Sequence, residues 1–371
     1  MKTITILCLH LGYGGIEKYI SSLCEMLKDD FKIKIISTYK IYDEPVFYID
    51  KKIDIEYLIE CKPCKEEMYE SLKNKQIFSF INYGIKNAKL LYLKNKLNIE
   101  AIKKIDSDFI ITTRDFHNHL VSKYANKNIT KIATEHNHHN NNEKYINNLI
   151  KSIKGFDYFV LVSKELQNFY KNKVENTKCL YIPNVIEKIN DKPLNNYNHN
   201  LISIGRLSKE KGFDDIIKLI YEIKKDINDI HLDLIGDGLE YNSLKQLIKK
   251  LKLEDNITMH GFKNKEEIDN IIKNDSLYVM TSHTESFGIV LIEAMSYGLP
   301  CIAFNSAQGA CEVISQKELL IENRNINEMK EKIIALLNNK KELKKIGLEN
   351  YEISKKYLSS NVKEDWKKIL K

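Results

Sequence analysis

Thr281-Ser-His-Thr-Glu285-Ser-Phe-Gly-Ile-Val-Leu-Ile-Glu293 is the stretch of the chain that decides the fold. It follows the apolar run Leu277–Met280, which has the length and composition of a buried strand. A short polar loop comes next, and the apolar spacing predicts a helix that begins near Phe287. Strand, loop and helix in this order form the repeating unit of a doubly wound α/β fold.

The same stretch carries two carboxylates, Glu285 in the loop and Glu293 about two turns into the predicted helix. Eight residues of helix span about 12 Å. The two carboxylates of a glycosidase stand about 5–9.5 Å apart, so a hydrolytic acid/base pair fits poorly. Two hydrogen-bonding positions on one extended ligand fit better. The helix start between them offers backbone N–H groups and the positive end of the helix dipole, which suits a diphosphate.

The rest of the chain repeats this unit. Strands are predicted in the first half at Thr3–Leu9, Lys32–Ser37, Phe109–Thr113, Lys131–Thr134, Tyr158–Val162 and Lys178–Ile182. In the second half they are predicted at Leu201–Ile204, His231–Ile235, Ile257–His260, Leu277–Met280 and Cys301–Phe304. Helical patterns such as Gly15–Leu27 and Glu143–Ile153 lie between the strands.

Two such series predict two doubly wound domains, residues 1–185 and 200–371, joined by the polar, Asn-rich linker 186–199. A ligand site is expected between them, at the carboxyl ends of the strands. The amphipathic stretch Leu343–Lys371 is expected to be helical, and to cap the second domain or pack back on the first.

Composition narrows the class of protein. Of 371 residues, 43% are hydrophobic and 29% charged, a soluble globular balance. A net charge of +7 is too small for a dedicated nucleic-acid binder but permits a basic face for anionic ligands or an anionic membrane surface. Seven scattered cysteines, an odd number, argue against a disulfide framework and favour a reducing compartment. No apolar stretch reaches spanning length. These features predict a cytoplasmic protein, with the inner face of the membrane as a second possible location.

A second motif is Ser203-Ile-Gly205-Arg206-Leu-Ser-Lys-Glu-Lys211-Gly212, which joins a predicted strand to a helix that starts near Phe213. Arg206 can hold a phosphate bidentately and Lys211 adds a point charge. Together they could stabilise a departing diphosphate. Taken alone, the loop is better explained as an ordinary surface loop with solvated cations. Ile235-Gly236-Asp-Gly238 follows another strand and predicts a tight turn.

In spacing these segments resemble the Glu-x7-Glu segment and the Gly-Arg…Lys-Gly loop of retaining GT-B glycosyltransferases of family 4, or group 1. The resemblance is strong from Ser203 to Pro300 and weak in the first half. It implies two Rossmann-like domains facing across a cleft and a nucleoside-diphosphate sugar, such as a UDP-sugar, as co-substrate, with no cofactor and no obligatory metal. It assigns the ribose hydroxyls to Glu293 and the transferred sugar to Glu285. The other donor-binding residues that it implies are Gly205, Arg206, Lys211, Gly236, Gly238, Ser286, Phe287, Gly288 and Ile289, with the two Gly-Asp-Gly glycines giving clearance beneath the base.

In the first half, Gly12-Tyr-Gly14-Gly15-Ile-Glu17 links the first strand to the first helix. Such a turn lets the backbone approach a phosphate or a sugar, although a bare tight turn explains it equally well. The motif lacks the full dinucleotide fingerprint, so a nicotinamide cofactor is not supported. The resemblance assigns Gly15 to the donor, and Gly14 and Glu17 to the acceptor.

Two further polar segments, 113–119 and 134–139, follow neighbouring predicted strands. Their histidines could hold a metal or form solvated loops, and their spacing fits no tight zinc pattern. The resemblance instead implies an active-site histidine near His117, with His136 one strand over and Arg114 and Glu135 orienting the acceptor. Asp106-Ser-Asp108 resembles a metal-binding Asp-x-Asp, but it precedes a strand, where a solvated turn is expected.

The segment 62–96 is rich in lysine, with tyrosine and phenylalanine interleaved. Ile77–Leu97 is either an amphipathic surface helix for an anionic membrane or lipid-linked acceptor, or a core helix with a solvated basic face.

The resemblance predicts that a hexose-type sugar moves, with retention, to a glycan or lipid-linked glycan hydroxyl in surface polysaccharide or glycoconjugate synthesis. The catalytic residues that it implies are His117, Arg206, Lys211 and Glu285. A sugar-nucleotide epimerase or phosphorylase on this fold, and a non-catalytic sugar-nucleotide-binding subunit, are the alternatives.

Overall fold

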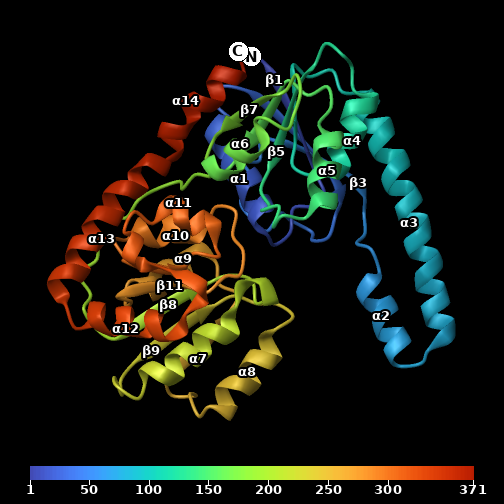
Figure 1. The fold of residues 1–371 in the computed structure, drawn as a ribbon. Helices are drawn as coiled ribbons and strands as arrows, with labels where there is room; N and C mark the ends of the chain where they lie inside the picture. The colour runs from blue at the N-terminus through green and yellow to red at the C-terminus, as the bar shows by residue number, and fades with distance from the viewer. The chain divides into compact units, whose positions relative to one another are not determined.

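The computed structural model describes residues 1–371, apart from the side chains of Lys65 and Glu66. The chain divides into two compact units, and each is a parallel sheet covered by helices (Figure 1). The first unit contains Met1–Leu161, Gln167–Tyr181 and Asp365–Lys371. The second contains Val162–Leu166 and Ile182–Glu364. The doubly wound α/β architecture expected from the sequence is therefore confirmed.

The first unit is built on seven parallel strands in the order β3-β2-β1-β4-β5-β6-β7. Their bounds are Thr3–Cys8 (β1), Lys32–Tyr39 (β2), Asp54–Ile59 (β3), Phe109–Thr112 (β4), Thr130–Glu135 (β5), Tyr158–Leu161 (β6) and Lys178–Tyr181 (β7). The helices are α1 (Gly15–Leu27), α2 (Lys65–Lys73), α3 (Ile77–Lys103), α4 (Asp115–Tyr124), α5 (Glu143–Ser152) and α6 (Lys164–Tyr170). The strand order reverses between β1 and β4, which brings the loops after these strands to one edge.

The second unit has six parallel strands in the order β10-β9-β8-β11-β12-β13, with its reversal between β8 and β11. Their bounds are Asn200–Ile204 (β8), His231–Ile235 (β9), Ile257–Gly261 (β10), Leu277–Met280 (β11), Cys301–Phe304 (β12) and Leu320–Ile321 (β13). The helices are α7 (Phe213–Ile223), α8 (Tyr241–Lys250), α9 (Lys265–Ile272), α10 (Ile289–Met295), α11 (Gln308–Val313), α12 (Ile326–Leu337), α13 (Lys340–Ser354) and α14 (Ser359–Ile369).

The predicted linker 186–199 is a packed part of the second unit. Ile186 forms a β-bridge with Leu358, and the Leu194 N–H donates to the Tyr297 carbonyl (2.7 Å). Polar composition pointed to a free connection, but these backbone hydrogen bonds hold the segment in place.

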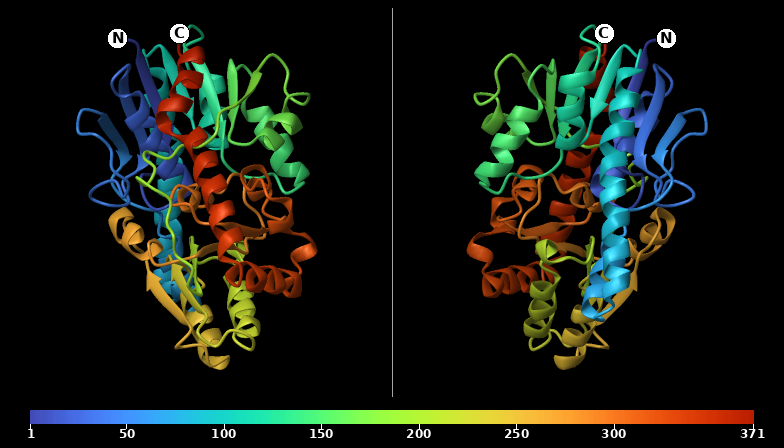
Figure 2. Two further views of the ribbon diagram at one scale, coloured as in Figure 1. Left: turned by 90° about the vertical axis from the view of Figure 1, so that its left-hand side faces the viewer. Right: turned by 90° about the vertical axis from the view of Figure 1, so that its right-hand side faces the viewer.

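The end of α14 belongs to the first unit. There Lys367 pairs with Asp30 (2.9 Å), and Trp366 is fully buried. Both ends of the chain therefore lie in the first unit (Figure 2).

Candidate active site

The loops after β8 and β11 are joined at the carboxyl edge of the second sheet. Lys211 Nζ lies 2.5 Å from Glu285 Oε2, although the two residues are 74 positions apart. Both side chains are largely buried, at 24% and 15% exposed. The His283 N–H donates to the Glu210 carbonyl (2.8 Å), which fixes the two loops backbone to backbone. The two motifs identified in the sequence thus form one charged site.

The backbone conformation at position 212 explains why a glycine follows Lys211 in the loop after β8. The φ of Gly212, +61°, is left-handed, and this residue ends a short 3₁₀ turn, Lys209–Lys211, just before α7. A Cβ on Gly212 would also overlap the Thr281 carbonyl oxygen. Only glycine fits both requirements. This close approach of the two loops places Lys211 beside Glu285.

Arg206 lies on the same loop but reaches into solvent, with its side chain 68% exposed. Its Nη2 is 3.0 Å from Glu210 Oε1. A surface ion pair of this kind contributes little stability, so the guanidinium can turn to a phosphate at small cost. The site therefore pairs one held cation, Lys211, with one adjustable cation, Arg206.

The predicted helix begins two residues later than expected, at Ile289. Gly288 has a φ of +79°, which an α-helix cannot continue, and the buried Phe287 ring packs 5.7 Å from that of Tyr357. Residues 286–288 are therefore loop rather than first turn, and α10 has only seven residues. Diphosphate binding by these amides stays a prediction. Glu293 is the fifth residue of α10 and is half-buried.

Arg324, which the sequence analysis did not identify, fastens the β11 loop. Its guanidinium donates to the carbonyls of Thr281 and Ser282 (both 2.9 Å) and pairs with Asp215 (2.5 Å) on α7. A planar, permanently charged group with several donors suits this position, where lysine would not. Arg324 thereby positions the loop that carries Glu285.

The glycines of the Gly-Asp-Gly turn lie against the Arg206 loop. A Cβ on Gly236 would overlap the Gly205 carbonyl, and one on Gly238 would overlap that of Leu207. The Leu207 N–H also donates to the Asp237 carbonyl (2.9 Å). The glycines therefore make room for the backbone of the Arg206 loop, and their clearance beneath a nucleotide base stays a prediction.

In the first unit, a charged cluster lies at the carboxyl edge of β1 and β4. Glu17 Oε1 is 3.3 Å from Arg114 Nη2 and 3.4 Å from His10 Nδ1, and the Glu17 side chain is only 3% exposed. Burial lowers the pKa of His10, although the Glu17 carboxylate opposes this shift. A Cβ on Gly14 would overlap the Glu17 carboxylate, whereas Gly15 faces open space. The structure thus brings together Glu17 and Arg114 and adds His10, which sequence reasoning missed.

His117 does not belong to this cluster. It lies on α4, is fully buried, and its Nε2 is 3.0 Å from Thr38 Oγ1. Burial, reinforced by Lys94 and Arg114, lowers the pKa of His117 to about 3. A side chain sealed in this way cannot touch a substrate. The predicted catalytic role of His117 is therefore wrong, because the residue lies on the inner face of its helix.

This burial predicts a pH dependence of stability. In the unfolded chain His117 is protonated below about pH 6.5, whereas in the folded chain its pKa is lowered to about 3. The unfolded state therefore binds more protons than the folded state in this window. The free energy of unfolding decreases as the pH is lowered, by about 1.4 kcal/mol per pH unit. Denaturant unfolding of the wild type and of His117→Gln at pH 7 and pH 5 measures this. The variant is expected to lose less stability, and an equal loss in both proteins would contradict the assignment.

His136 is the remaining candidate histidine. Its ring lies 4.1 Å from that of Tyr19, and its Nε2 is 2.9 Å from Thr134 Oγ1. Burial, reinforced by Arg114, lowers its pKa to about 3, so the ring is neutral at physiological pH. Glu135 is almost fully buried and accepts the N–H groups of His136 (2.8 Å) and Asn137 (2.7 Å). Glu135 therefore shapes this loop, and its predicted contact with an acceptor stays a prediction.

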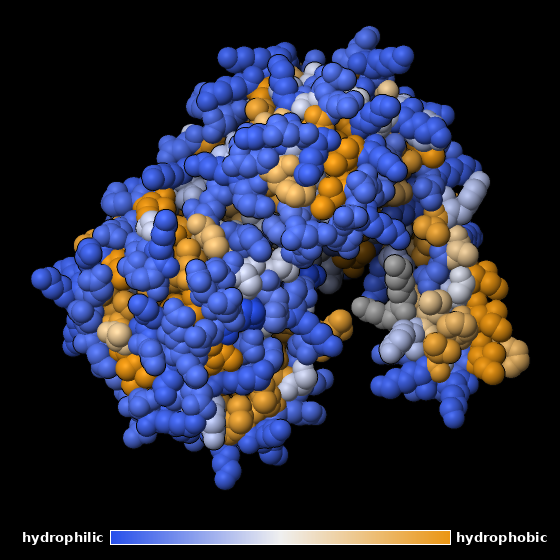
Figure 3. All heavy atoms as spheres, in the orientation of Figure 1, coloured by the Kyte–Doolittle hydropathy of each residue, from blue (hydrophilic) through white to orange (hydrophobic). Residues whose placement is uncertain are grey.

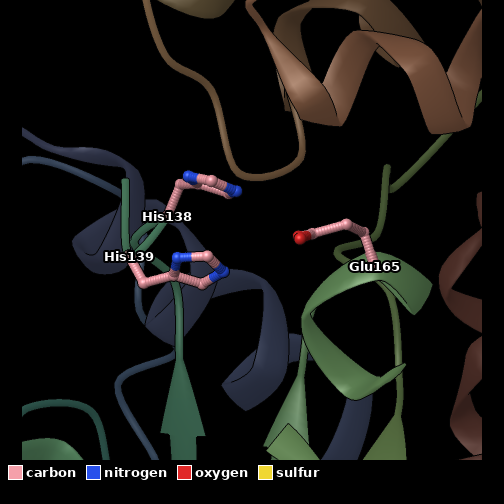
Figure 4. A group of neighbouring side chains, drawn as sticks. All are labelled: His138, His139 and Glu165. Carbon is pink, nitrogen blue, oxygen red and sulfur yellow. The ribbon is translucent and has the colours of Figure 1, made fainter. Parts of the chain in front are cut away.

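His138 and His139 follow in the same loop (Figure 4). Their rings stack at 4.4 Å, and each Nδ1 accepts a backbone N–H, from Asn140 and Asn141 respectively (both 3.0 Å). These contacts give the pair a role in ordering the loop. Asp108, of the Asp-x-Asp segment, accepts the Thr3 N–H (2.7 Å) at the opposite edge of the sheet, as expected for a turn.

Solved structures similar to this chain include glycosyltransferases. A variant of Staphylococcus aureus TarM in complex with fondaparinux, α-GlcNAc-glycerol and UDP superimposes with a TM-score of 0.79 at 16% identity, over 100% of this chain and 99% of the other. The pneumococcal O-GlcNAc transferase GtfA in complex with UDP and GlcNAc gives 0.75 at 16% identity, over 100% and 99%. The chain therefore has the GT-B fold of these structures, with two doubly wound units.

The second half of the chain is similar to a glycosyltransferase family. Residues 185–352, a little under half of the chain, match the model of the glycosyl transferases group 1. An uncharacterized glycosyltransferase of Haemophilus influenzae is 28% identical over the full length of both chains. The poly(ribitol-phosphate) alpha-N-acetylglucosaminyltransferase of Staphylococcus aureus is 29% identical over 65% of this chain and 50% of its own length.

Proposed function

We propose that this chain transfers a hexose-type sugar from a nucleoside-diphosphate sugar to a glycan or lipid-linked glycan hydroxyl, with retention of configuration. The observation that carries the proposal is the Lys211–Glu285 pair, held beside the adjustable Arg206 at the carboxyl edge of the second sheet. Two cations suit a diphosphate leaving group, and a carboxylate next to them suits the hydroxyls of the sugar attached to it.

When the donor binds, Lys211 and Glu285 would separate and contact two different parts of it. The ammonium turns to the diphosphate, while the carboxylate accepts a sugar hydroxyl. Because Lys211 engages Glu285, same-face displacement assisted by the departing diphosphate fits better than a covalent intermediate on Glu285. Breakage of the glycosidic bond then places charge on the phosphate beside two cations.

The acceptor would use the charged cluster of the first unit. Glu17 is buried and already held by Arg114, so it can align a hydroxyl with little loss of freedom. The neutral His136 and the open backbone near Gly14 complete the acceptor residues in this proposal. Relatives named for poly(ribitol-phosphate) and poly(glycerol-phosphate) support an acceptor in surface polysaccharide or glycoconjugate synthesis. The inner face of the membrane is the place of action in this proposal.

The proposal is tested with purified protein and a panel of nucleotide sugars. One donor is expected to raise the thermal midpoint and to be consumed faster when a glycan acceptor is added. Conversion of the donor sugar without acceptor would indicate an epimerase instead. Stabilisation by a donor with neither hydrolysis nor transfer would indicate a non-catalytic binding subunit.

Glu293→Ala tests the ribose assignment. Loss of a hydrogen bond to a charged group costs about 1.5–3 kcal/mol, so the Kd for the nucleoside diphosphate is expected to rise roughly 10- to 100-fold. Isothermal titration calorimetry measures this. Glu331→Ala, an exposed acid on α12, is the control and should bind as the wild type does. Unchanged affinity in Glu293→Ala would remove Glu293 from the ribose.

A further inference from the structure

The first unit carries an extended feature that the proposed transfer reaction does not use. We call α2 and residues 77–92 of α3 the hairpin arm. Asn87 fastens its two helices, because its side chain accepts the Cys64 N–H (2.9 Å) and donates to the Cys64 carbonyl (3.2 Å). Further along α3, Asn98 and Ile102 are buried, and Asn98 Oδ1 accepts the Thr38 hydroxyl (3.2 Å). The 27 residues of α3 span about 40 Å, so the helix is anchored at one end and extends beyond the sheet at the other (Figures 1 and 2).

The hairpin arm exposes a continuous apolar stripe. Phe78 is 91% exposed and Ile85 65%, values far above those of a packed helix. Phe78, Ile81, Ile85, Ala88 and Tyr92 recur every three or four residues and therefore share one face of α3. Ile77 and Leu91 on α3, and Tyr69 and Leu72 on α2, are also exposed. Figure 3 shows this apolar surface over the arm. A patch of this kind usually marks a site of interaction.

The charged residues on the exposed part of α3 are all basic, whereas α2 also contains glutamates. Residues 71–99 contain six lysines and no aspartate or glutamate, in a chain that has 51 acidic residues. Lys86, Lys89 and Lys96 are exposed on α3, and the helical spacing places Lys89 and Lys96 beside the stripe. The expected partner must therefore offer apolar surface and negative charge side by side.

We propose that the hairpin arm docks on an anionic lipid bilayer, with α3 lying in the plane of the interface. Acyl chains would take up Phe78, Ile81 and Ile85, while the lipid phosphates would meet the three lysines. Among the described residues no helix is both long enough and apolar enough to cross a membrane, in keeping with an arm that lies on the surface. A second copy of the chain would match this surface poorly, because each arm would bring its own lysines against the other.

Vesicle co-sedimentation tests the charge half of the proposal. The protein should bind vesicles of phosphatidylcholine mixed with phosphatidylglycerol, and bind phosphatidylcholine alone far more weakly. Each lysine near an anionic surface contributes about a factor of five, so Lys86→Gln/Lys89→Gln/Lys96→Gln should lower partitioning roughly 100-fold. The matched control is Lys245→Gln/Lys249→Gln/Lys250→Gln, three exposed lysines on α8, which should bind as the wild type does. Equal binding by the two triple variants would overturn the proposal.

Insertion of the apolar stripe into the bilayer can be measured separately, by tryptophan fluorescence. The single native tryptophan, Trp366, is buried, so a Phe78→Trp variant adds a second emitter whose spectrum can be separated. Anionic vesicles should shift its emission to the blue, and Ile81→Ser/Ile85→Ser should weaken binding while leaving donor binding unchanged. If the emission shifts with protein concentration in the absence of lipid, and vesicles add nothing, the arm binds a second copy and the membrane proposal fails.

Discussion

Lys211→Met is expected to lower turnover by about 10²–10³-fold while weakening donor binding much less. The lysine is held beside Glu285 at 2.5 Å before any ligand arrives, so its charge needs little reorganisation when the leaving diphosphate gains charge. An interaction that strengthens in the transition state lowers the turnover number more than the affinity. Steady-state kinetics with saturating donor measures the first quantity, and calorimetry with the nucleoside diphosphate measures the second.

Lys209→Met is the matched control for this variant. Lys209 is on the same 3₁₀ turn but is exposed, so its loss should leave turnover within a few-fold of the wild type. Arg206→Ala should also lower turnover more than donor affinity, because Arg206 stands at the open side of the same loop. Near-normal turnover in Lys211→Met would exclude Lys211 from the chemistry and remove the main support for the proposed transfer reaction.

Most of the fold could be predicted from the sequence because its parallel strands are buried on both faces. Runs such as Phe109–Thr112 and Leu277–Met280 are buried throughout and almost entirely apolar, and periodicity separates them from the helices. Helix α1 has the predicted bounds, Gly15–Leu27. Strand β13 has two residues, Leu320 and Ile321, which is too short to leave a pattern. The packing of residues 186–199 depends on backbone hydrogen bonds, which composition does not reveal.

The site residues that belong to a sequence motif could be predicted. Those that act only through tertiary contacts could not. Lys211 and Glu285 each stand in a recognisable loop, whereas Arg324 acts through carbonyls some forty positions away. One feature of the sequence could have identified Arg324. Only three of the 58 basic residues are arginines, and each follows a strand: Arg114 after β4, Arg206 after β8 and Arg324 after β13. A chain that uses lysine almost everywhere places arginine where a planar, multidentate cation is needed.

For the histidines the error was a wrong assignment and not an omission. His117 and His136 both follow strands that end at the same edge, and sequence position alone does not tell which ring points inward. His117 is the third residue of α4 and falls on the face that meets Thr38 of β2. His10 lies two residues after the end of the first strand and was not among the predicted site residues, although a polar residue at that point of a parallel sheet is a site candidate.

Gly236→Ala is expected to lower the free energy of unfolding of the second unit by about 3 kcal/mol or more. The φ of Gly236 is +144°, a conformation that alanine adopts only with strain. A Cβ there would also overlap the Gly205 carbonyl, and both partners are backbone, so no side chain can move aside. Strain and overpacking each cost about 1–3 kcal/mol. Urea unfolding monitored by circular dichroism measures the loss.

The same substitution should also impair the site, because Gly205 precedes Arg206 and its N–H is held by the Ile235 carbonyl (3.0 Å). Displacing Gly205 moves the loop that carries both cations, so donor affinity and turnover should fall together at temperatures where the protein is still folded. Gly84→Ala is the control: Gly84 lies within α3 with open space around it, and alanine there should add up to about 1 kcal/mol of stability. If Gly236→Ala unfolds at the wild-type denaturant concentration, the turn does not hold the Arg206 loop.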